Sequence, residues 1–395
     1  MSSFPEHAVL KTVALKFSGV ELKLKTSHAL FSSHHVDAGT MLLLKTLAQR
    51  GSVPDCGRVL DAGCGTGPLA LALKKFRPAL EVWARDRLAL AAAFTAENAR
   101  LNRVAVDTAP GLLLDGVPGP WDLIVSNLPA KAGEPVLADF VRRAVSLLGP
   151  GGVAAVVIVE PLAAWFSAEL DRAGVARVYE EAASGYRVFH FGSSGSVPAP
   201  LGPPFPAAYA RGETAWSVGP RSLSLKTFYG LPNFDSLDFR LQLTFGVLAG
   251  QVLRGDGLVW EPGQGHLAAW ADAVLPPGGD LHLAGNDLLA LEAAREAVVR
   301  RLASLHPVAR LSEVALGPGS LSWALVQLYP EPEVPWVEEA RGALLRLLAP
   351  GARAVVNGSS TDLTRFLERH QGLRKVSDGR AKGWRVVVLE RLGVN

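Results

Sequence analysis

Cysteine is scarce in this chain of 395 residues, where Cys56 and Cys64 are the only two. Two cysteines cannot build a disulfide framework or a zinc cluster, which excludes small domains stabilised in those ways. Long apolar runs are also missing, because stretches such as residues 88–94 and 152–159 fall well short of the ~20 residues that span a membrane. The N-terminus shows no basic and apolar leader. We therefore expect a cytoplasmic protein without a metal or a membrane partner.

A strong charge of either sign is absent as well. The formal net charge is +3, and only 19% of the residues are charged. This mild basic bias permits a nucleic-acid partner without requiring one. Hydrophobic residues make up 49% of the chain, so large cores can form, and the length favours two domains over one.

The two halves of the chain repeat each other at a spacing of about 200 residues. The matches follow one another in order, which chance seldom produces. They pair residues 24–26 (LKT) with 225–227, 59–65 (VLDAGCG) with 259–265 (VWEPGQG), 147–151 (LLGPG) with 347–351 (LLAPG), and 185–188 (GYRV) with 383–386 (GWRV). The sequence therefore predicts a tandem duplication.

The repeat suggests a first domain at residues 1–194, a linker at 195–208 that is rich in proline and glycine, and a second domain at 209–395. In the first half, strand-like runs alternate with helical patterns, which is typical of a doubly wound, mostly parallel α/β sheet. Two final strands would add an antiparallel edge hairpin. The expected strands are residues 58–61, 81–84, 104–106, 122–126, 153–159, 177–181 and 186–191, and the expected helices include residues 41–47 and 68–76.

Three glycines alternate in residues 61–67, which read DAGCGTG. They lie between a predicted strand and a predicted helix, where the backbone can approach a ligand and free N–H groups of the helix can bind it. A dinucleotide-binding turn would carry its last glycine at position 68, which is Pro68 here. Asp86 follows the next strand, at a place suited to holding ribose hydroxyls. A plain turn and a solvated aspartate remain the alternatives.

The turn resembles the D-x-G-x-G-x-G motif of class I S-adenosylmethionine-dependent methyltransferases. The resemblance implies S-adenosyl-L-methionine as the cofactor and two tandem Rossmann-like domains of this class. It also implies that Asp61 orients the ammonium group of the cofactor. The cofactor-binding residues implied within this part are Asp61, Ala62, Gly63, Cys64, Gly65, Gly67, Asp86 and Arg87.

Residues 122–131 (DLIVSNLPAK) form an apolar strand that ends in Asn-Leu-Pro. They are similar to the [N/D/S]-x-P-[Y/F] motif of methyltransferases that modify planar amino groups. The resemblance implies that the Asn127 side chain and the Leu128 carbonyl accept the two N–H bonds of the amine, with Pro129 fixing the turn. Ala130 stands where the family has an aromatic residue, and Lys131 follows as a candidate substrate contact. The alternative for Asn127 is a simple cap at a strand end.

Residues 31–43 (FSSHHVDAGTMLL) resemble the F-S-x(4)-D-x-G-[ST]-x-L-L-L segment of the ribosomal RNA guanine-N2 methyltransferases. The resemblance implies that this segment closes over the methionine end of the cofactor, through Phe31, Asp37, Gly39 and Thr40, with Asn127 also in contact. Taken together, the three motifs extend the similarity over about residues 16–194. His34 and His35 lack the spacing of metal ligands.

The second copy has lost parts of these motifs. At an offset of 200, Leu267 replaces the third glycine, and at an offset of 201, Leu328 faces Asn127. We therefore expect a degenerate domain that packs or binds substrate. Its last hairpin carries cations around an aromatic residue, which suits phosphates and a base. These candidate substrate-binding residues are Arg374, Lys375, Arg380, Lys382, Trp384 and Arg385. A solvated charged hairpin is the alternative.

The resemblance predicts methyl transfer to an exocyclic amine of an RNA base, foremost the N2 amine of guanine in ribosomal RNA or a ribosomal subunit. Two alternatives stay open at this point. One is methylation of a protein or small-molecule amine, which the alanine at position 130 favours. The other is a non-catalytic RNA-binding or assembly factor that retains the cofactor fold. The sequence leaves the oligomeric state undetermined.

Overall fold

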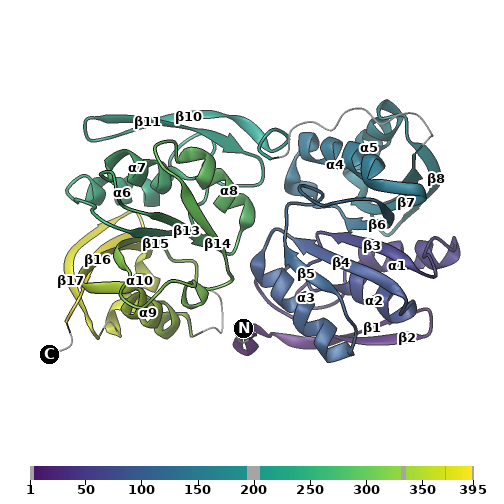
Figure 1. The fold of residues 1–395 in the computed structure, drawn as a ribbon, viewed down its shortest axis with the longest axis horizontal. Coiled ribbons are helices and arrows are strands. Elements are labelled where there is room, and N and C mark those ends of the chain that lie inside the picture. Colours follow the sequence, from purple (N-terminus) through teal and green to yellow (C-terminus); the bar gives the residue numbers. More distant parts are fainter. Residues whose placement is uncertain (1–3, 194–204, 331–334, 370, 394–395) are drawn as a thin grey trace. The chain divides into compact units, whose positions relative to one another are not determined.

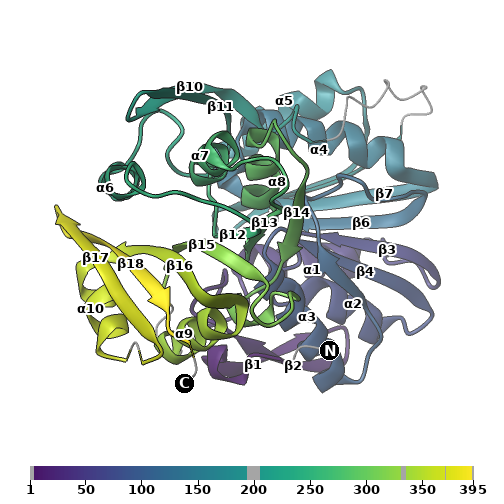
Figure 2. The same cartoon turned by 60° about the vertical axis from the view of Figure 1, so that its left-hand side comes forward.

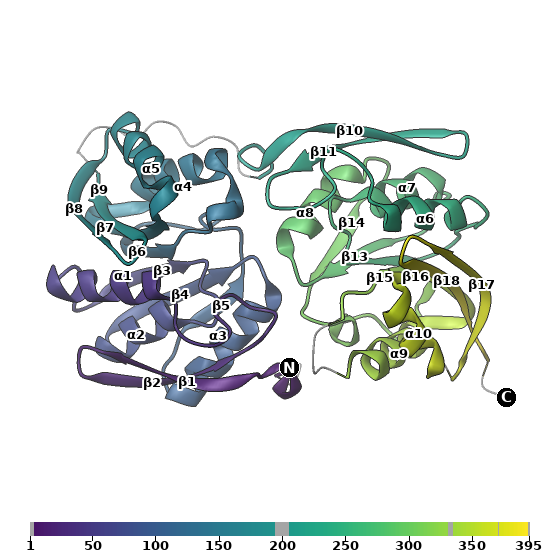
Figure 3. The same cartoon turned by 180° about the vertical axis from the view of Figure 1, so that it is seen from behind.

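The computed structural model describes residues 4–193, 205–330, 335–369 and 371–393, and its contacts divide the chain into two compact units. Unit 1 is Met1–Tyr209 and unit 2 is Ala210–Asn395. Most of the expected linker at 195–208 lies outside the described residues. Each unit is a sheet with helices on both faces, as Figures 1 and 3 show from opposite sides. The prediction of two tandem Rossmann-like domains is confirmed.

Unit 1 contains a seven-stranded sheet in the order β5-β4-β3-β6-β7-β9-β8. The first five strands of this order are parallel, and the hairpin of β9 and β8 is antiparallel. The order reverses between β3 and β6, and ligands of such sheets bind at the carboxyl ends of the strands beside this reversal. The strands are β3 (Gly57–Ala62), β4 (Leu80–Asp86), β5 (Asp107–Pro110), β6 (Trp121–Asn127), β7 (Leu148–Val159), β8 (Ala176–Ala183) and β9 (Tyr186–Gly192).

Alternate residues of the central strands pack into two separate cores, as expected for strands buried on both faces. Val59, Val125 and Val157 face the side of α1, α2 and α3, whereas Leu60 and Ile124 face α4 and α5. The helices are α1 (Ala38–Gln49), α2 (Pro68–Phe76), α3 (Ala89–Asn102), α4 (Glu134–Leu147) and α5 (Glu160–Arg172), with short 3-10 turns at Glu6–Ala8 and Ala130–Ala132. Figure 2 shows the two helical layers of this unit in another view.

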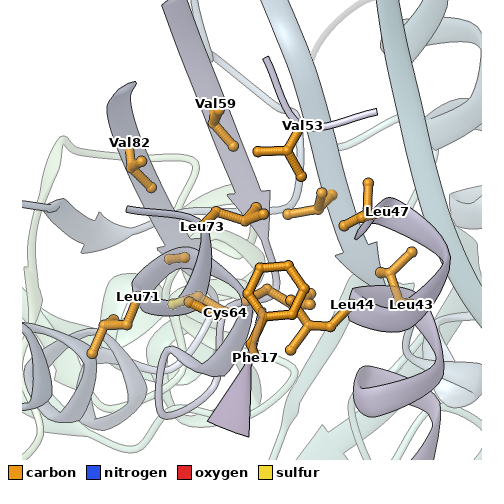
Figure 4. Close-up of a cluster of buried hydrophobic side chains, with 14 of the residues drawn as sticks. Phe17, Leu43, Leu44, Leu47, Val53, Val59, Cys64, Leu71, Leu73 and Val82 are labelled. Carbon is orange, nitrogen blue, oxygen red and sulfur yellow. The ribbon is translucent and has the colours of Figure 1, made fainter. Parts of the chain in front are cut away.

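An N-terminal hairpin of β1 (Lys11–Phe17) and β2 (Val20–Thr26) covers the first core. Its Phe17 side chain lies among Leu44, Leu71 and Cys64, as Figure 4 shows. Lys23 and Lys25 of β2 exchange backbone hydrogen bonds with the side-chain amides of α3, which take the place of a neighbouring strand. The sequence reasoning missed this hairpin.

One strand prediction in unit 1 is wrong. β5 occupies Asp107–Pro110 rather than residues 104–106. Val104 instead closes the C-terminus of α3, where its N–H donates to the Ala99 carbonyl at 3.0 Å. Val104 and Val106 are apolar because they pack against the core as the chain enters the sheet, and not because they belong to a strand.

Unit 2 repeats this architecture, with a sheet order of β14-β13-β12-β15-β16-β18-β17 and a separate hairpin of β10 and β11. No helix in the described parts of the chain is long and apolar enough to cross a membrane. The strands are β10 (Ala210–Val218), β11 (Arg221–Phe228), β12 (Gly257–Trp260), β13 (Leu281–Gly285), β14 (Ala303–Pro307), β15 (Leu321–Gln327), β16 (Leu348–Ser359), β17 (Leu373–Ala381) and β18 (Trp384–Arg391). The helices are α6 (Phe239–Leu248), α7 (His266–Val274), α8 (Leu288–Ala297), α9 (Trp336–Leu347) and α10 (Ser360–Glu368), with a 3-10 turn at Leu311–Glu313.

Candidate cofactor and acceptor site

The glycine turn joins the carboxyl end of β3 to the N-terminus of α2, and its three glycines have positive φ angles. A Cβ on Gly65 would meet no atom of the chain within 4 Å, and a Cβ on Gly63 would meet its nearest neighbour only at 3.9 Å. Gly67 differs, because a Cβ there would lie 2.6 Å from the Leu71 side chain and 2.9 Å from that of Thr95. Gly63 and Gly65 therefore leave room for a ligand, and Gly67 lets α2 and α3 pack closely.

Asp61 lies at the end of β3 and is fully buried. Its Oδ2 accepts the N–H of Ala70 at 2.9 Å, and its Oδ1 has no partner within the described residues. Burial away from water raises the pKa of this carboxyl from its ordinary 3.8 to about 7. A buried acid with one unpaired oxygen suits a cationic group of a ligand.

Asp86 ends β4 and connects that strand to the glycine turn. Its Oδ2 accepts the N–H of Gly65 and its Oδ1 accepts that of Leu88, both at 2.9 Å. The carboxylate therefore fixes the turn conformation in this structure. Arg87 follows it in the chain, and Ala62 and Cys64 are buried beside the turn.

Asn127 ends β6, on the other side of the point where the strand order reverses. Its Nδ2 donates to Asp37 Oδ2 at 2.8 Å and to Thr40 Oγ1 at 3.0 Å. A carboxylate oxygen can only accept, so the NH2 group must face Asp37. Because both amide hydrogens are engaged, the Oδ1 atom is the part of this side chain that can serve an acceptor amine.

The residues after Asn127 keep the motif in place. The Leu128 N–H donates to the Val157 carbonyl at 3.0 Å, which extends the β6–β7 ladder, and the Leu128 side chain is buried. Pro129 begins a short turn in which its carbonyl accepts the Ala132 N–H at 2.9 Å. Lys131 in this turn is exposed.

The upstream segment reaches the same end of the sheet through α1. Asp37 caps this helix, because its Oδ2 accepts the Thr40 N–H at 3.1 Å. Asp37, Gly39 and Thr40 are buried beside Asn127, whereas the Phe31 side chain is 70% exposed. The structure therefore brings together Asp37, Thr40 and Asn127 from segments about 90 residues apart. It leaves Phe31 in an open loop.

The cations of the last hairpin of unit 2 have partners within the unit, but two acids, Asp378 and Glu390, serve four of the five, so the hairpin keeps a net positive charge. Arg385 is buried and donates two hydrogen bonds to Asp378, and Lys375 also pairs with Asp378 at 3.0 Å. Three further candidates have partners as well: Arg374 pairs with Glu390, Arg380 lies 3.7 Å from Asp378, and Lys382 lies over the ring of Phe239. Trp384 lies near the guanidinium of Arg240.

The sheet register corrects the sequence alignment of the two copies. The motifs at residues 147–151 and 347–351 align β7 with β16 at an offset of 200. Trp121 of β6 pairs with Leu148, and Leu321 of β15 pairs with Leu348, so β6 and β15 also correspond at 200. However, Leu123 pairs with Val59, whereas Trp323 pairs with Gly257, so β3 and β12 correspond at 198. The prediction that Leu267 replaces the third glycine is therefore wrong.

At the offset of 198, Gly265 corresponds to Gly67, and each is the left-handed cap before its helix. The glycine that is lost is Gly63, whose place Glu261 takes with a φ of 53°. Its carboxylate extends to the end of β13 and accepts the N–H of Asn286 at 2.8 Å. Val259 stands in place of Asp61. Unit 2 thus lacks both the acid and one open glycine.

The assignment of Leu328 to the place of Asn127 is also wrong. The N–H groups of Leu128 and Leu328 bond to equivalent carbonyls of β7 and β16, so Gln327 is the true counterpart of Asn127. Gln327 is buried, and its Nε2 donates to the Glu261 backbone carbonyl. The amide is retained but is directed into the turn of its own unit.

Comparison with known proteins agrees with this geometry. Residues 21–189 match the family model of the methyltransferase small domain. The chain is 35% identical over 128 residues to the ribosomal RNA small subunit methyltransferase C of Pasteurella multocida, which covers 32% of this chain and 37% of that relative. It is 36% identical over 141 residues to the release factor glutamine methyltransferase of Deinococcus radiodurans, over 30% of this chain and 51% of that relative. The chain therefore spans about a third to a half of the length of these relatives.

One solved structure resembles the whole chain. The 16S rRNA N2 methyltransferase of T. thermophilus, in complex with AdoMet and guanosine, matches with a TM-score of 0.66 and 18% identity. The match covers 98% of this chain and 99% of that one, which supports the fold of both units.

Proposed function

We propose that the chain is an S-adenosylmethionine-dependent N-methyltransferase that acts on guanine N2 of ribosomal RNA, in keeping with the match of residues 21–189 to the methyltransferase small domain. The observation that carries the proposal is the orientation of the Asn127 amide: Asp37 and Thr40 hold its two hydrogens, so the oxygen, which can only accept, faces away from them. An amine with two N–H bonds is the acceptor that such an oxygen fits.

The residues of the turn after β3 fit the cofactor. Gly63 and Gly65 leave space that any side chain would fill, and the unpaired Asp61 Oδ1 offers a partner to an ammonium group. Asp86 lies at the end of the next strand, where a carboxylate can reach ribose hydroxyls. When bound, the cofactor supplies an electrophilic methyl group on a sulfonium.

Asn127 and the Leu128 carbonyl would then act on the acceptor. The exocyclic nitrogen of guanine is a weak nucleophile, because its lone pair is delocalised into the ring. Accepting its N–H bonds holds the nitrogen as it becomes tetrahedral and directs the lone pair toward the methyl group. A new N–C bond forms as the S–C bond breaks, and the nitrogen loses one proton to solvent.

The substrate class is supported by the relatives. The small subunit methyltransferase of Pasteurella multocida has ribosomal RNA in its name, and the T. thermophilus structure holds guanosine. The similarity to a glutamine methyltransferase favours a second candidate, a side-chain amide of a protein, because such an amide is also planar. Ala130 agrees with that candidate, since it offers no ring on which a base could stack.

A labelling experiment separates these acceptors. The purified chain is incubated with methyl-labelled S-adenosylmethionine and, in parallel, with small ribosomal subunits, their naked RNA and their extracted proteins, all from cells that lack this protein. We expect label in RNA, recovered as N2-methylguanosine after digestion to nucleosides. Label confined to protein would support the glutamine-type reaction, and label in no fraction would contradict both candidates.

A further inference from the structure

Tyr186 lies next to the acceptor site, although it belongs only to the internal repeat at residues 185–188 and to none of the cofactor or acceptor motifs. It is the first residue of β9 and pairs with Val159 at the carboxyl end of β7. Its hydroxyl donates to Asp37 Oδ1 at 2.8 Å. This hydrogen bond is the main reason why the pKa of Tyr186 is raised above its ordinary value.

The Asp37 carboxylate is thereby held on both oxygens. Oδ1 accepts from Tyr186, and Oδ2 accepts from the Thr40 N–H and from Asn127 Nδ2. Charge-assisted hydrogen bonds of this kind are about twice as strong as neutral ones. A continuous chain of bonds therefore runs from the edge hairpin, through the cap of α1, to the amide at the end of β6.

Gly39 makes this arrangement sterically possible. A Cβ on Gly39 would lie 2.6 and 2.8 Å from two ring carbons of Tyr186 and 2.9 Å from Asp37 Oδ2. The ring therefore fills the space beside the first turn of α1, where any larger residue would displace it.

In unit 2, the corresponding helix cap lacks this chain of hydrogen bonds. Asp238 caps α6 just as Asp37 caps α1, and accepts the Leu241 N–H at 2.7 Å. However, Arg240 stands in place of Gly39 and Trp384, which has no hydroxyl, in place of Tyr186. The second oxygen of Asp238 accepts instead from Asn233 Nδ2 at 3.2 Å. Gln327 turns toward Glu261 instead. Capping alone thus does not require the tyrosine, and the tyrosine occurs in the unit that keeps the asparagine.

We propose that Tyr186 is a positioning residue, which acts through Asp37 to hold the Asn127 amide with its oxygen toward the acceptor nitrogen. The proposal rests on the function inferred above and adds to it a residue 59 positions after Asn127. Without the hydroxyl, the Asp37 carboxylate keeps the α1 cap but gains freedom to rotate. The Asn127 amide would then sample orientations in which its oxygen no longer faces the amine.

The test compares Tyr186→Phe with Tyr179→Phe. Tyr179 is a matched control, because its hydroxyl also donates to a carboxylate, that of Glu181 at 2.7 Å, and it lies in the same hairpin. We expect Tyr186→Phe to lower the single-turnover rate of methyl transfer by ~10-fold, as for the loss of one charge-assisted hydrogen bond. KM for RNA and the affinity for S-adenosylmethionine should change less than about threefold, and Tyr179→Phe should leave the rate unchanged.

A double-mutant cycle tests whether the effect passes through the amide. In an Asn127→Ala background, Tyr186→Phe should have little further effect on the rate, because the group that it positions is gone. An undiminished rate in Tyr186→Phe, or an equal loss in the Asn127→Ala background, would overturn the proposal.

A second readout does not depend on activity. With asparagine labelled in ¹⁵N, the side-chain NH2 signal of Asn127 is assigned by its absence in Asn127→Ala. Its hydrogen exchange with water should quicken in Tyr186→Phe and not in Tyr179→Phe. Unchanged exchange would contradict the positioning role, whether or not the protein methylates RNA. If the wild-type protein methylated no RNA, the proposed function would be contradicted instead.

Discussion

At the scale of single residues, we expect Asp61 to make cofactor binding depend on pH. Its pKa of about 7 lies above the ordinary 3.8 because burial disfavours the charged form. The raised pKa therefore contributes to the free energy of unfolding of the free protein. This contribution is fully present below about pH 4 and is lost as the pH rises through about 7. A bound cationic ligand would instead favour the ionised carboxylate of Asp61 and so lower its pKa.

We therefore expect S-adenosylmethionine to release about one proton from Asp61 when it binds near pH 6. Calorimetry in buffers of different ionisation enthalpy measures this proton count. The Asp61→Asn variant cannot ionise at this position and should release about one proton fewer than the wild type. Equal proton release by the two proteins would show that Asp61 does not change its charge on binding.

At the scale of elements, α3 connects the N-terminal hairpin to the glycine turn. The Asn98 amide bonds with the Lys25 N–H and carbonyl and also donates to the Thr66 carbonyl at 2.9 Å. One turn later, the Asn102 amide makes three similar bonds, to the backbone of Lys23 and to the Asn98 carbonyl, but none to the glycine turn. The two residues are therefore a matched pair.

Replacing either asparagine by alanine should lower the free energy of unfolding by about 2–4 kcal/mol, because buried backbone groups lose their partners. Only Asn98→Ala should also weaken S-adenosylmethionine binding, by ~3–10-fold, since it alone frees the turn. Urea denaturation and calorimetry measure the two effects. A similar loss of affinity in Asn102→Ala would show that the hairpin, and not the bond to Thr66, controls the turn.

The elements near the turn after β3 could be predicted because their signals are local. α2 occupies residues 68–76 as expected, since Pro68 favours the first helical position and Gly67 the left-handed cap. The duplication was also visible, but its register near β12 was not. Glycines spaced two apart match equally well after a shift of two residues, and only the ladder from Gly257 to Trp323 fixes the correspondence.

Hydrogen bonds between residues far apart in the chain could not be predicted from the sequence. Asn127 was identified from its motif, but its bonds to Asp37 and Thr40 depend on how α1 crosses the end of β6. Tyr186 lies outside the cofactor and acceptor motifs and comes 149 residues after its partner Asp37. The pairing of the last hairpin's cations with Asp378 and Glu390 likewise depends on the cross-strand register, which the sequence does not give.

At the scale of the whole molecule, the duplicated chain should bind one cofactor rather than two. Unit 2 has Glu261 in place of Gly63 and Val259 in place of Asp61, so its turn lacks one of the two open glycines and the buried acid. Calorimetry with S-adenosylmethionine should give one site per chain. Two equivalent sites would contradict the assignment of unit 2 as degenerate.

The single site should disappear in Gly65→Val, because the new side chain fills the open space above the turn. Gly174→Val is the control, since Gly174 has a similar φ of 63° but lies in the turn after α5. Both variants carry backbone strain, and only the first should lose binding. Retained affinity in Gly65→Val would place the cofactor elsewhere.

The most direct test of the proposed chemistry is the single-turnover rate of methyl transfer to ribosomal RNA by Asn127→Ala. In the proposed mechanism, the Asn127 oxygen binds the amine most strongly as the nitrogen becomes tetrahedral, so its loss should raise mainly the energy of the transition state. We expect the rate to fall by ~100-fold or more, with a far smaller change in cofactor affinity. A variant that methylates guanine N2 at the wild-type rate would contradict the role of this amide and the mechanism built on it.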